Sequence, residues 1–402
     1  MNNEKKYLIF NCFIGCAQLL FTGAVAQNFL LYIGLSVGQV SVYTSVLQVA
    51  QVLAMLPLCV FGDKMKRVRA VNAIILYFMP IIFLSFLFIG SPILKTAQAK
   101  YAIALIVGTV VYLAYGVYNV FCYKLPYYLF DMQKYGKISS IGGMLSGSIG
   151  IFITFLMSTL VKRFDYLAVT SCFFILGILF YIGAATLCCL FKLHKPHFEH
   201  ETKQTASFKG LFKLPVFYKL IPAHVLRGIG NGIVLLAVII GSDTGILNTE
   251  TAVTASFLYS VATVVGYFIY TLSEKKLGSN GLLFYSGALT AVTAPLCVCF
   301  GNLETFFIFY SLNNIFNVIY SMAVPVTITK IVPFEMMGKY TSARMLLFTF
   351  GSALPGFFME SLLSSVGGTA TLLIGGVFLL ASCLLYSIVA IKHKTELPTF
   401  EE

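Results

Sequence analysis

The chain has 402 residues, of which 58% are hydrophobic and only 10% are charged. Because charged residues make up about 25% of a typical soluble domain, this composition excludes a water-soluble globular protein. The net charge of +12 would favour nucleic-acid binding in a soluble chain. Here the basic residues lie between long apolar segments, so no nucleic-acid partner is predicted.

Apolar segments follow one another along the whole chain, each long enough to cross a bilayer as a helix. They are continuous in hydrophobicity rather than alternating, which excludes a transmembrane β-barrel. The sequence therefore predicts an all-α membrane protein with twelve transmembrane helices. We expect these helices at about residues 7–33, 39–61, 71–91, 100–125, 139–160, 166–191, 218–241, 251–272, 282–300, 304–332, 341–363 and 369–391.

The first segment resembles a secretory signal, because Lys5 and Lys6 precede it and Ala24-Val25-Ala26 lies near its end. It stays apolar as far as Ile33, which is too long for the apolar region of a signal, so we expect it to be retained. With the N-terminus inside, 22 Lys and Arg residues face the cytoplasm and 4 face outward. This asymmetry predicts a multi-pass protein of the cell (plasma) membrane with both termini cytoplasmic.

A polar stretch from Lys192 to Pro215 divides the chain into halves that repeat each other weakly. Asp63-Lys64 corresponds to Glu274-Lys275, and Asn119 corresponds to Asn317. Such repeats are typical of transporters that are built from duplicated bundles. We expect an N-terminal six-helix bundle at 1–191, a cytoplasmic linker at 192–217, and a C-terminal six-helix bundle with a short cytoplasmic tail at 218–402.

The loop between the second and third helices reads Gly62-Asp63-Lys64-Met65-Lys66-Arg67-Val68-Arg69. With its weaker copy at Glu274 and Lys275, this loop resembles the signature of the major facilitator superfamily, although a second glycine is missing. The resemblance implies two pseudo-symmetric bundles and a latch in the outward-facing state. The gating residues would be Gly62, Asp63, Lys64, Arg67, Glu274 and Lys275. The alternative is that the cations only obey the positive-inside rule.

Arg227 lies inside the seventh segment, with His224 one turn before it and Asn231 one turn after it on the same face. An arginine at this depth is costly and therefore a candidate site residue. Its guanidinium would bind a carboxylate or phosphate of a substrate through two parallel hydrogen bonds. The alternative is a side chain that snorkels or pairs with a carbonyl or acid of the protein.

In the superfamily the first, fourth, seventh and tenth helices line the substrate path, and polar side chains gather in these segments here. They add Gln18, Tyr115, Asn119, Asn313 and Asn317 to the candidate substrate-binding residues. Glu360 is the only carboxylate well inside a segment. It is a candidate for carrying a coupling proton, and the alternative is an interface residue near the outer surface.

The sequence contains no Walker loop and no HExxH, so neither an ATP-driven transporter nor an enzyme is predicted. The ten cysteines lie in apolar segments as small hydrophobic residues, and we predict no metal site and no cofactor. In the linker, His194, His197 and His200 favour a solvated basic segment over a metal or pH sensor.

Together these features predict a secondary transporter that moves a small polar or anionic organic solute by alternating access. We expect a monomer in the lipid bilayer that binds a small-molecule substrate, with a proton or counter-substrate as the candidate coupling partner. Two alternatives stay open. One is a multidrug or amphiphile exporter of the same superfamily, and the other is a non-transporting membrane sensor, scaffold or lipid enzyme.

If the loop is a latch, Asp63→Asn removes a charge-assisted hydrogen bond worth about 1.5–3 kcal/mol. This loss would shift the conformational equilibrium about ten- to a hundredfold toward the inward-open state. Cysteines introduced at positions 119 and 317 should then react faster with a cytoplasmic thiol reagent, while transport falls. Unchanged labelling and flux would show that the loop is no latch and that its cations only obey the positive-inside rule.

Overall fold

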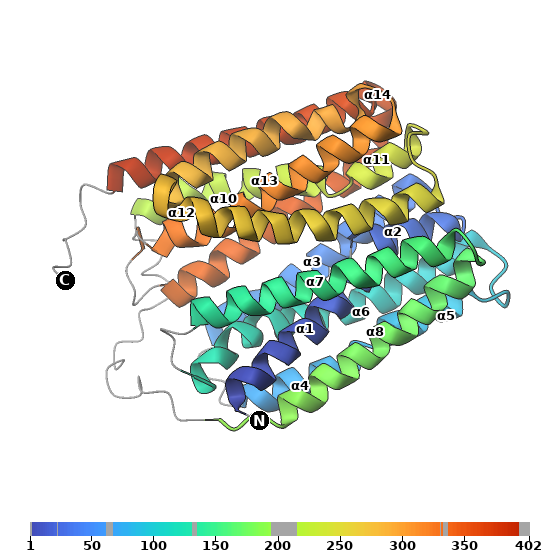
Figure 1. Ribbon diagram of the computed structural model, residues 1–402, viewed down its shortest axis with the longest axis horizontal. Coiled ribbons are helices and arrows are strands. Elements are labelled where there is room, and N and C mark those ends of the chain that lie inside the picture. The colour runs from blue at the N-terminus through green and yellow to red at the C-terminus, as the bar shows by residue number, and fades with distance from the viewer. Residues whose placement is uncertain are drawn as a thin grey trace. The chain divides into compact units, whose positions relative to one another are not determined.

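The computed structural model describes residues 2–21, 23–61, 67–130, 135–193, 215–329, 331–332 and 337–393. Within these ranges the regular elements are helices, with no β-strand (Figure 1). In chain order they are α1 (Asn3–Phe21), α2 (Gly23–Tyr32), α3 (Val37–Phe61), α4 (Val68–Phe78), α5 (Ile81–Gly90), α6 (Ala97–Lys124), the 3-10 helix η2 (Leu125–Tyr128), α7 (Tyr135–Val161), α8 (Tyr166–Cys189), α10 (Pro215–Val234), α11 (Ala237–Asp243), α12 (Thr249–Cys299), α13 (Leu303–Thr329) and α14 (Met337–His393).

Eleven helical stretches of the described residues are long and apolar enough to cross a membrane. The last of them, Ser342–Lys392, has 51 residues and contains Gly367 with a φ of 79°. Glycine adopts this left-handed conformation without the steric penalty of a Cβ atom. Since about 20 residues cross the hydrocarbon core, the stretch consists of two spans that meet at Gly367. The predicted twelve-helix membrane fold is thereby confirmed, and the chain is a multi-pass membrane protein.

Helix boundaries differ from the predicted spans where the backbone bends. The third span is divided into α4 and α5, because Pro80 has no N–H with which to continue the α-helical pattern. Around Pro80 the backbone instead forms a tighter hydrogen bond, spanning three residues, from Ile82 N to Met79 O at 3.1 Å. The range of α12 comprises two helices that meet at Gly278, whose φ of 67° is not helical. This glycine lies between two predicted spans and marks the turn between them.

The described helices fall into two compact units. The first comprises Met1–Lys203 together with Ser242–Val264, and the second comprises Gln204–Gly241 together with Val265–Glu402. In the first unit, Asn28 Nδ2 donates to Thr249 O at 3.1 Å and to the Tyr166 hydroxyl at 3.2 Å. This pair of bonds helps to hold the start of α12 against the first unit. The predicted division at the linker stays a prediction.

Aromatic packing forms the core of the first unit. Phe174 of α8 contacts Phe29 of α2 and Phe86 of α5, with ring centroids 5.0 and 5.2 Å apart. Phe83 also packs on Phe174, and its ring lies so close to Gly177 that an added Cβ would be only 2.5 Å away. Aromatic pairs of this geometry contribute about 0.5–1.5 kcal/mol beyond their buried area. They fix α2 and α5 against α8.

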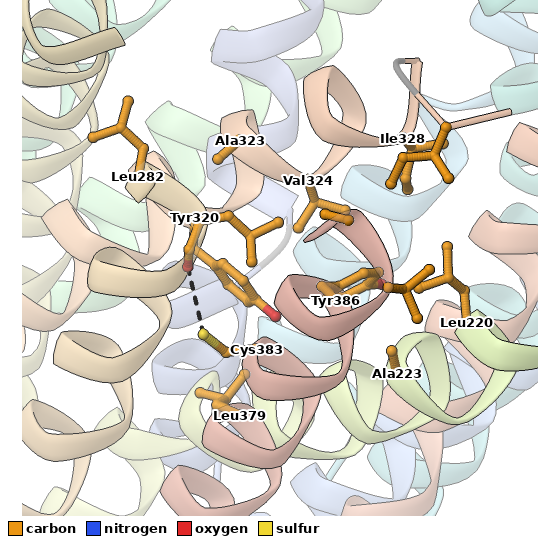
Figure 2. Packing of buried hydrophobic residues seen from close by; sticks show 14 of the residues in the cluster. Leu220, Ala223, Leu282, Tyr320, Ala323, Val324, Ile328, Leu379, Cys383 and Tyr386 are labelled. Atoms are coloured by element: carbon orange, nitrogen blue, oxygen red, sulfur yellow. Dashed lines mark hydrogen bonds between the residues drawn. The ribbon is translucent and has the colours of Figure 1, made fainter. Parts of the chain in front are cut away.

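The second unit has a buried cluster contributed by α10, α12, α13 and α14 (Figure 2). Tyr320 of α13 and Tyr386 of α14 are 0% and 1% exposed. The Cys383 thiol donates to the Leu283 carbonyl at 3.6 Å, which links α14 to α12 (Figure 2). Both tyrosines bring hydroxyl groups into the cluster, where the Tyr320 hydroxyl bonds Ser382 and the Tyr386 hydroxyl bonds His224.

Helices α10 and α14 approach each other backbone to backbone. A Cβ atom added at Gly351 would meet the Val225 carbonyl oxygen and would lie 3.1 Å from Gly228 Cα. At Gly232 an added Cβ would lie 2.5 Å from the Ser352 carbonyl oxygen. Small residues at such crossings let membrane helices approach closely, which replaces the hydrophobic driving force that lipid cannot supply. This crossing fixes the position of α10 against the early turns of α14.

We expect Gly351→Ala to destabilise the protein by about 1–3 kcal/mol, because the new methyl group overpacks the crossing. The measurement is the apparent Tm in detergent. Gly281→Ala is the matched control, since its Cβ would meet only Leu277 Cβ at an ordinary 3.5 Å. Equal Tm values for the two variants would contradict the backbone contact between α10 and α14.

Candidate functional site

The site is built around Arg227 on α10. This helix begins at Pro215, a residue that suits the first helical position because its missing N–H would have no partner there. Arg227 follows twelve residues later in the span Pro215–Asp243, about 18 Å along the helix axis. This is close to the midplane of a hydrocarbon core of about 30 Å. The side chain is 8% exposed, so its charge is largely removed from water.

Aromatic rings and a hydroxyl group surround the Arg227 guanidinium. Its central carbon lies 5.0 Å from the ring centroid of Tyr320 and 5.0 Å from that of Phe348. Its Nη2 donates to Ser321 Oγ at 2.9 Å. Within the described part of the chain, Arg227 forms no ion pair with a carboxylate. The rings orient the guanidinium and favour its charge, but the counter-charge is left to another molecule.

One helical turn along, Asn231 and Asn317 form a second link between α10 and α13, the helix that carries Ser321. Asn317 Nδ2 donates to Asn231 Oδ1 at 3.1 Å. Both side chains are half-buried, and Ser321, one turn after Asn317 on α13, is exposed. The structure therefore brings three of the predicted substrate-binding residues together, Arg227, Asn231 and Asn317; their contact with a solute stays a prediction.

His224 shares this helix but has a different environment. Its Nε2 is 2.8 Å from the Tyr340 hydroxyl, and its Nδ1 bonds the Tyr386 hydroxyl. The residue is 1% exposed. Because both ring nitrogens are bound to tyrosines, we interpret His224 as a residue that positions α14 beside Arg227. Contact of His224 with a solute stays a prediction.

Asn313 lies apart from the Arg227 group. Its Nδ2 donates to Thr290 O at 2.8 Å and to Thr293 Oγ1 at 3.1 Å, both on α12, and the side chain is 1% exposed. A buried amide that bonds a neighbouring helix stabilises helix packing. Its predicted role in substrate binding has no support from this geometry.

In the first unit, three of the predicted residues lie near one another. Gln18 Nε2 of α1 donates to the Tyr115 hydroxyl of α6 at 2.9 Å. The Tyr115 ring stacks on Tyr118 with centroids 6.0 Å apart and an interplanar angle of 17°. Asn119 follows Tyr115 by one turn and is half-buried. This polar and aromatic face connects the first and fourth predicted spans, as Asn231 and Asn317 connect the seventh and tenth.

The remaining predicted residues lie elsewhere. Arg67 is exposed next to the start of α4, and Glu274, with Lys275 after it, lies in α12 just before Gly278. Glu360 is exposed, seven residues before Gly367, which agrees with the interface alternative. The remaining predictions fall outside the described residues: Gly62, Asp63 and Lys64 of the gating loop, and His194, His197 and His200 of the linker.

Four residues that contact the site were not predicted from the sequence: Ser321, Phe348, Tyr340 and Tyr386. Ser321 had a usable signal, because it follows Asn317 by four residues and therefore lies on the same helix face. The other three lie on α14, more than a hundred residues along the chain from α10. Phe348 and Tyr340 approach α10 on the span that crosses it at Gly228 and Gly351, and Tyr386 on the span that meets Gly230 at Gly375, and no local pattern specifies either contact.

Comparisons with known proteins place the fold. No protein-family model matches the sequence, and no curated protein matches it. Solved structures do match: a D-xylose–proton symporter has a TM-score of 0.71 at 12% identity, covering 95% of this chain and 96% of that one. An outward-facing bacterial homologue of the iron transporter ferroportin has a TM-score of 0.69 at 15% identity, covering 98% and 100%.

The nucleoside transporter NupG also matches, with a TM-score of 0.63 at 14% identity over 98% of this chain and 99% of that one. These solved structures are major facilitator superfamily transporters. At such low identity they establish the fold alone. The chain has the major facilitator fold, as its sequence resemblance implied.

Asn313→Ala should lower the free energy of unfolding by about 1–3 kcal/mol, because Thr290 O and Thr293 Oγ1 lose their buried donor. Asn119→Ala is the control, since this half-buried amide has no hydrogen bond to another described residue. Thermal unfolding in detergent compares the two variants. A larger loss of Tm in Asn119→Ala would contradict the packing role of Asn313.

Proposed function

We propose that this chain is a secondary transporter that carries a small polar or anionic organic solute across the cell membrane by alternating access. The observation that carries the proposal is the buried Arg227, which has aromatic and hydroxyl neighbours and no carboxylate partner among the described residues. The fold supports transport in general, because the matched structures with this architecture are transporters of sugars, nucleosides and iron.

The charge of Arg227 favours an anion. Removal of an ion from water costs several kcal/mol even after relaxation, and the hydroxyl groups of Ser321 and Tyr386 with two rings offset only part of this cost. A solute carboxylate or phosphate would supply the missing charge through a bidentate pair.

A cationic solute would need a deep carboxylate, and the described acids lie near helix ends. Asp243 and Glu250 border the turn between α11 and α12, Glu304 is in the first turn of α13, and Glu360 is exposed near Gly367. These positions can be solvated, so they do not balance a cation at the midplane. An amphiphile exporter is the second candidate, favoured by the stacked Tyr115 and Tyr118 rings.

The test is a thermal-shift panel of organic carboxylates, organic phosphates, sugars, nucleosides and cationic amphiphiles on purified protein. An anion at a hundred times its Kd should stabilise the wild type by about 2.7 kcal/mol. Arg227→Gln should abolish this stabilisation, and Arg227→Lys should retain part of it, because an ammonium group keeps the charge but loses the planar fork.

Arg163→Gln is the matched control, since Arg163 is an exposed arginine between α7 and α8. It should leave the anion response unchanged. A response limited to cationic amphiphiles would support the exporter instead. Anion binding without counterflow in proteoliposomes would favour the non-transporting sensor.

A further inference from the structure

The two polar links between α10 and α13 have a regular geometry. Arg227 bonds Ser321, and Asn231 bonds Asn317, at 2.9 and 3.1 Å. Four residues separate the members on each helix, and they occur in opposite order, so the two helices run antiparallel here. With a rise of 1.5 Å per residue, the links lie about 6 Å apart along the helices.

The Asn231–Asn317 pair has unused hydrogen-bonding capacity. An asparagine amide offers two donors and an acceptor oxygen. The bond from Asn317 Nδ2 to Asn231 Oδ1 uses one donor and one lone pair, and neither side chain has another hydrogen bond to a described residue. The Asn231 amino group and the Asn317 carbonyl oxygen are therefore open. Together they present a donor and an acceptor to the same ligand group.

Neighbouring amides on α13 show what a purely structural role requires. Asn313 and Asn314 are 1% and 6% exposed. Each donates to a backbone carbonyl, Thr290 O or Tyr310 O, at 2.8 Å. Asn317 and Asn231 are less buried and bond only each other, while Ser321 is exposed. Asn317 thus lies on the less buried face of α13, one turn from Ser321, whose hydroxyl accepts from the Arg227 guanidinium.

We propose that the solute has two polar groups about 6 Å apart: an anionic group that binds Arg227, and an uncharged hydroxyl or amide that binds the Asn231–Asn317 pair. This inference rests on the proposed function and specifies its substrate class. A hydroxyl group would accept from Asn231 Nδ2 and donate to Asn317 Oδ1. A second carboxylate has no proton to donate to Asn317 Oδ1 and would find no second cation in the pair, so dicarboxylates are disfavoured.

Binding of four five-carbon acids to the purified full chain tests the inference. Pentanoate has the anion alone, 5-hydroxypentanoate and glutaramate add an uncharged polar group at the far end, and glutarate adds a second carboxylate. We expect 5-hydroxypentanoate and glutaramate to bind about tenfold more tightly than pentanoate and glutarate, which is about 1.4 kcal/mol. 4-Hydroxybutyl phosphate, compared with butyl phosphate, shows whether the anionic group is a carboxylate or a phosphate.

Variants separate the two subsites. Asn231→Ala and Asn317→Ala should each remove the advantage of 5-hydroxypentanoate and leave the Kd of pentanoate within about threefold. Arg227→Gln should weaken all of these acids. Asn313→Ala is the control for lost stability, because it removes a structural amide from the same helix and should preserve the tenfold ratio.

The outcomes distinguish the inference from the function on which it rests. Equal affinities of the wild type for pentanoate and 5-hydroxypentanoate, both dependent on Arg227, would overturn the two-group substrate and leave the anion transporter intact. A preserved ratio in both asparagine variants would also overturn it, since the pair would then only join α10 to α13. Failure of every acid and phosphate to bind, or binding that survives Arg227→Gln, would contradict the proposed function itself.

Discussion

The cost of holding the Arg227 guanidinium near the membrane midplane governs the organisation of the second unit. Lipid offers neither water nor counter-ions, so the protein must orient and partly stabilise this charge itself. It does so with the rings of Tyr320 and Phe348 and with the Ser321 hydroxyl. These groups come from α14, which packs on α10, and from α13, which reaches α10 through side-chain bonds. Their contacts satisfy part of the guanidinium and leave donors for a solute.

Close helix packing makes this arrangement possible. Gly228 lies next to Arg227, and its backbone touches α14 so closely that a Cβ would meet the Phe348 carbonyl oxygen. The same turn of α14 thus provides both the backbone contact and the Phe348 ring. Farther along, Tyr386 bonds His224. Small residues therefore let α14 approach α10 closely, and aromatic side chains of α14 can then contact the polar residues of α10.

Hydropathy was sufficient to predict the helices, because lipid leaves the backbone no other way to satisfy its hydrogen bonds. Helical spacing placed His224, Arg227 and Asn231 on one face, and the superfamily resemblance added Asn317 to the same predicted substrate path. The sequence could not separate Asn313 from Asn317, because only the neighbouring α12 reveals that Asn313 is already bonded. Nor could it identify Tyr340 and Tyr386, whose approach to His224 depends on tertiary packing.

The central claim is that a solute anion supplies the counter-charge of Arg227. Crystals soaked with a bromine-labelled five-carbon hydroxy acid test it most directly, because anomalous scattering locates the bromine independently of the protein. The account predicts a bromine peak beside α10 and α13, with the carboxylate on the Arg227 guanidinium and the hydroxyl at Asn231 and Asn317. A peak elsewhere, or a protein carboxylate bound to Arg227 in the crystal, would contradict it.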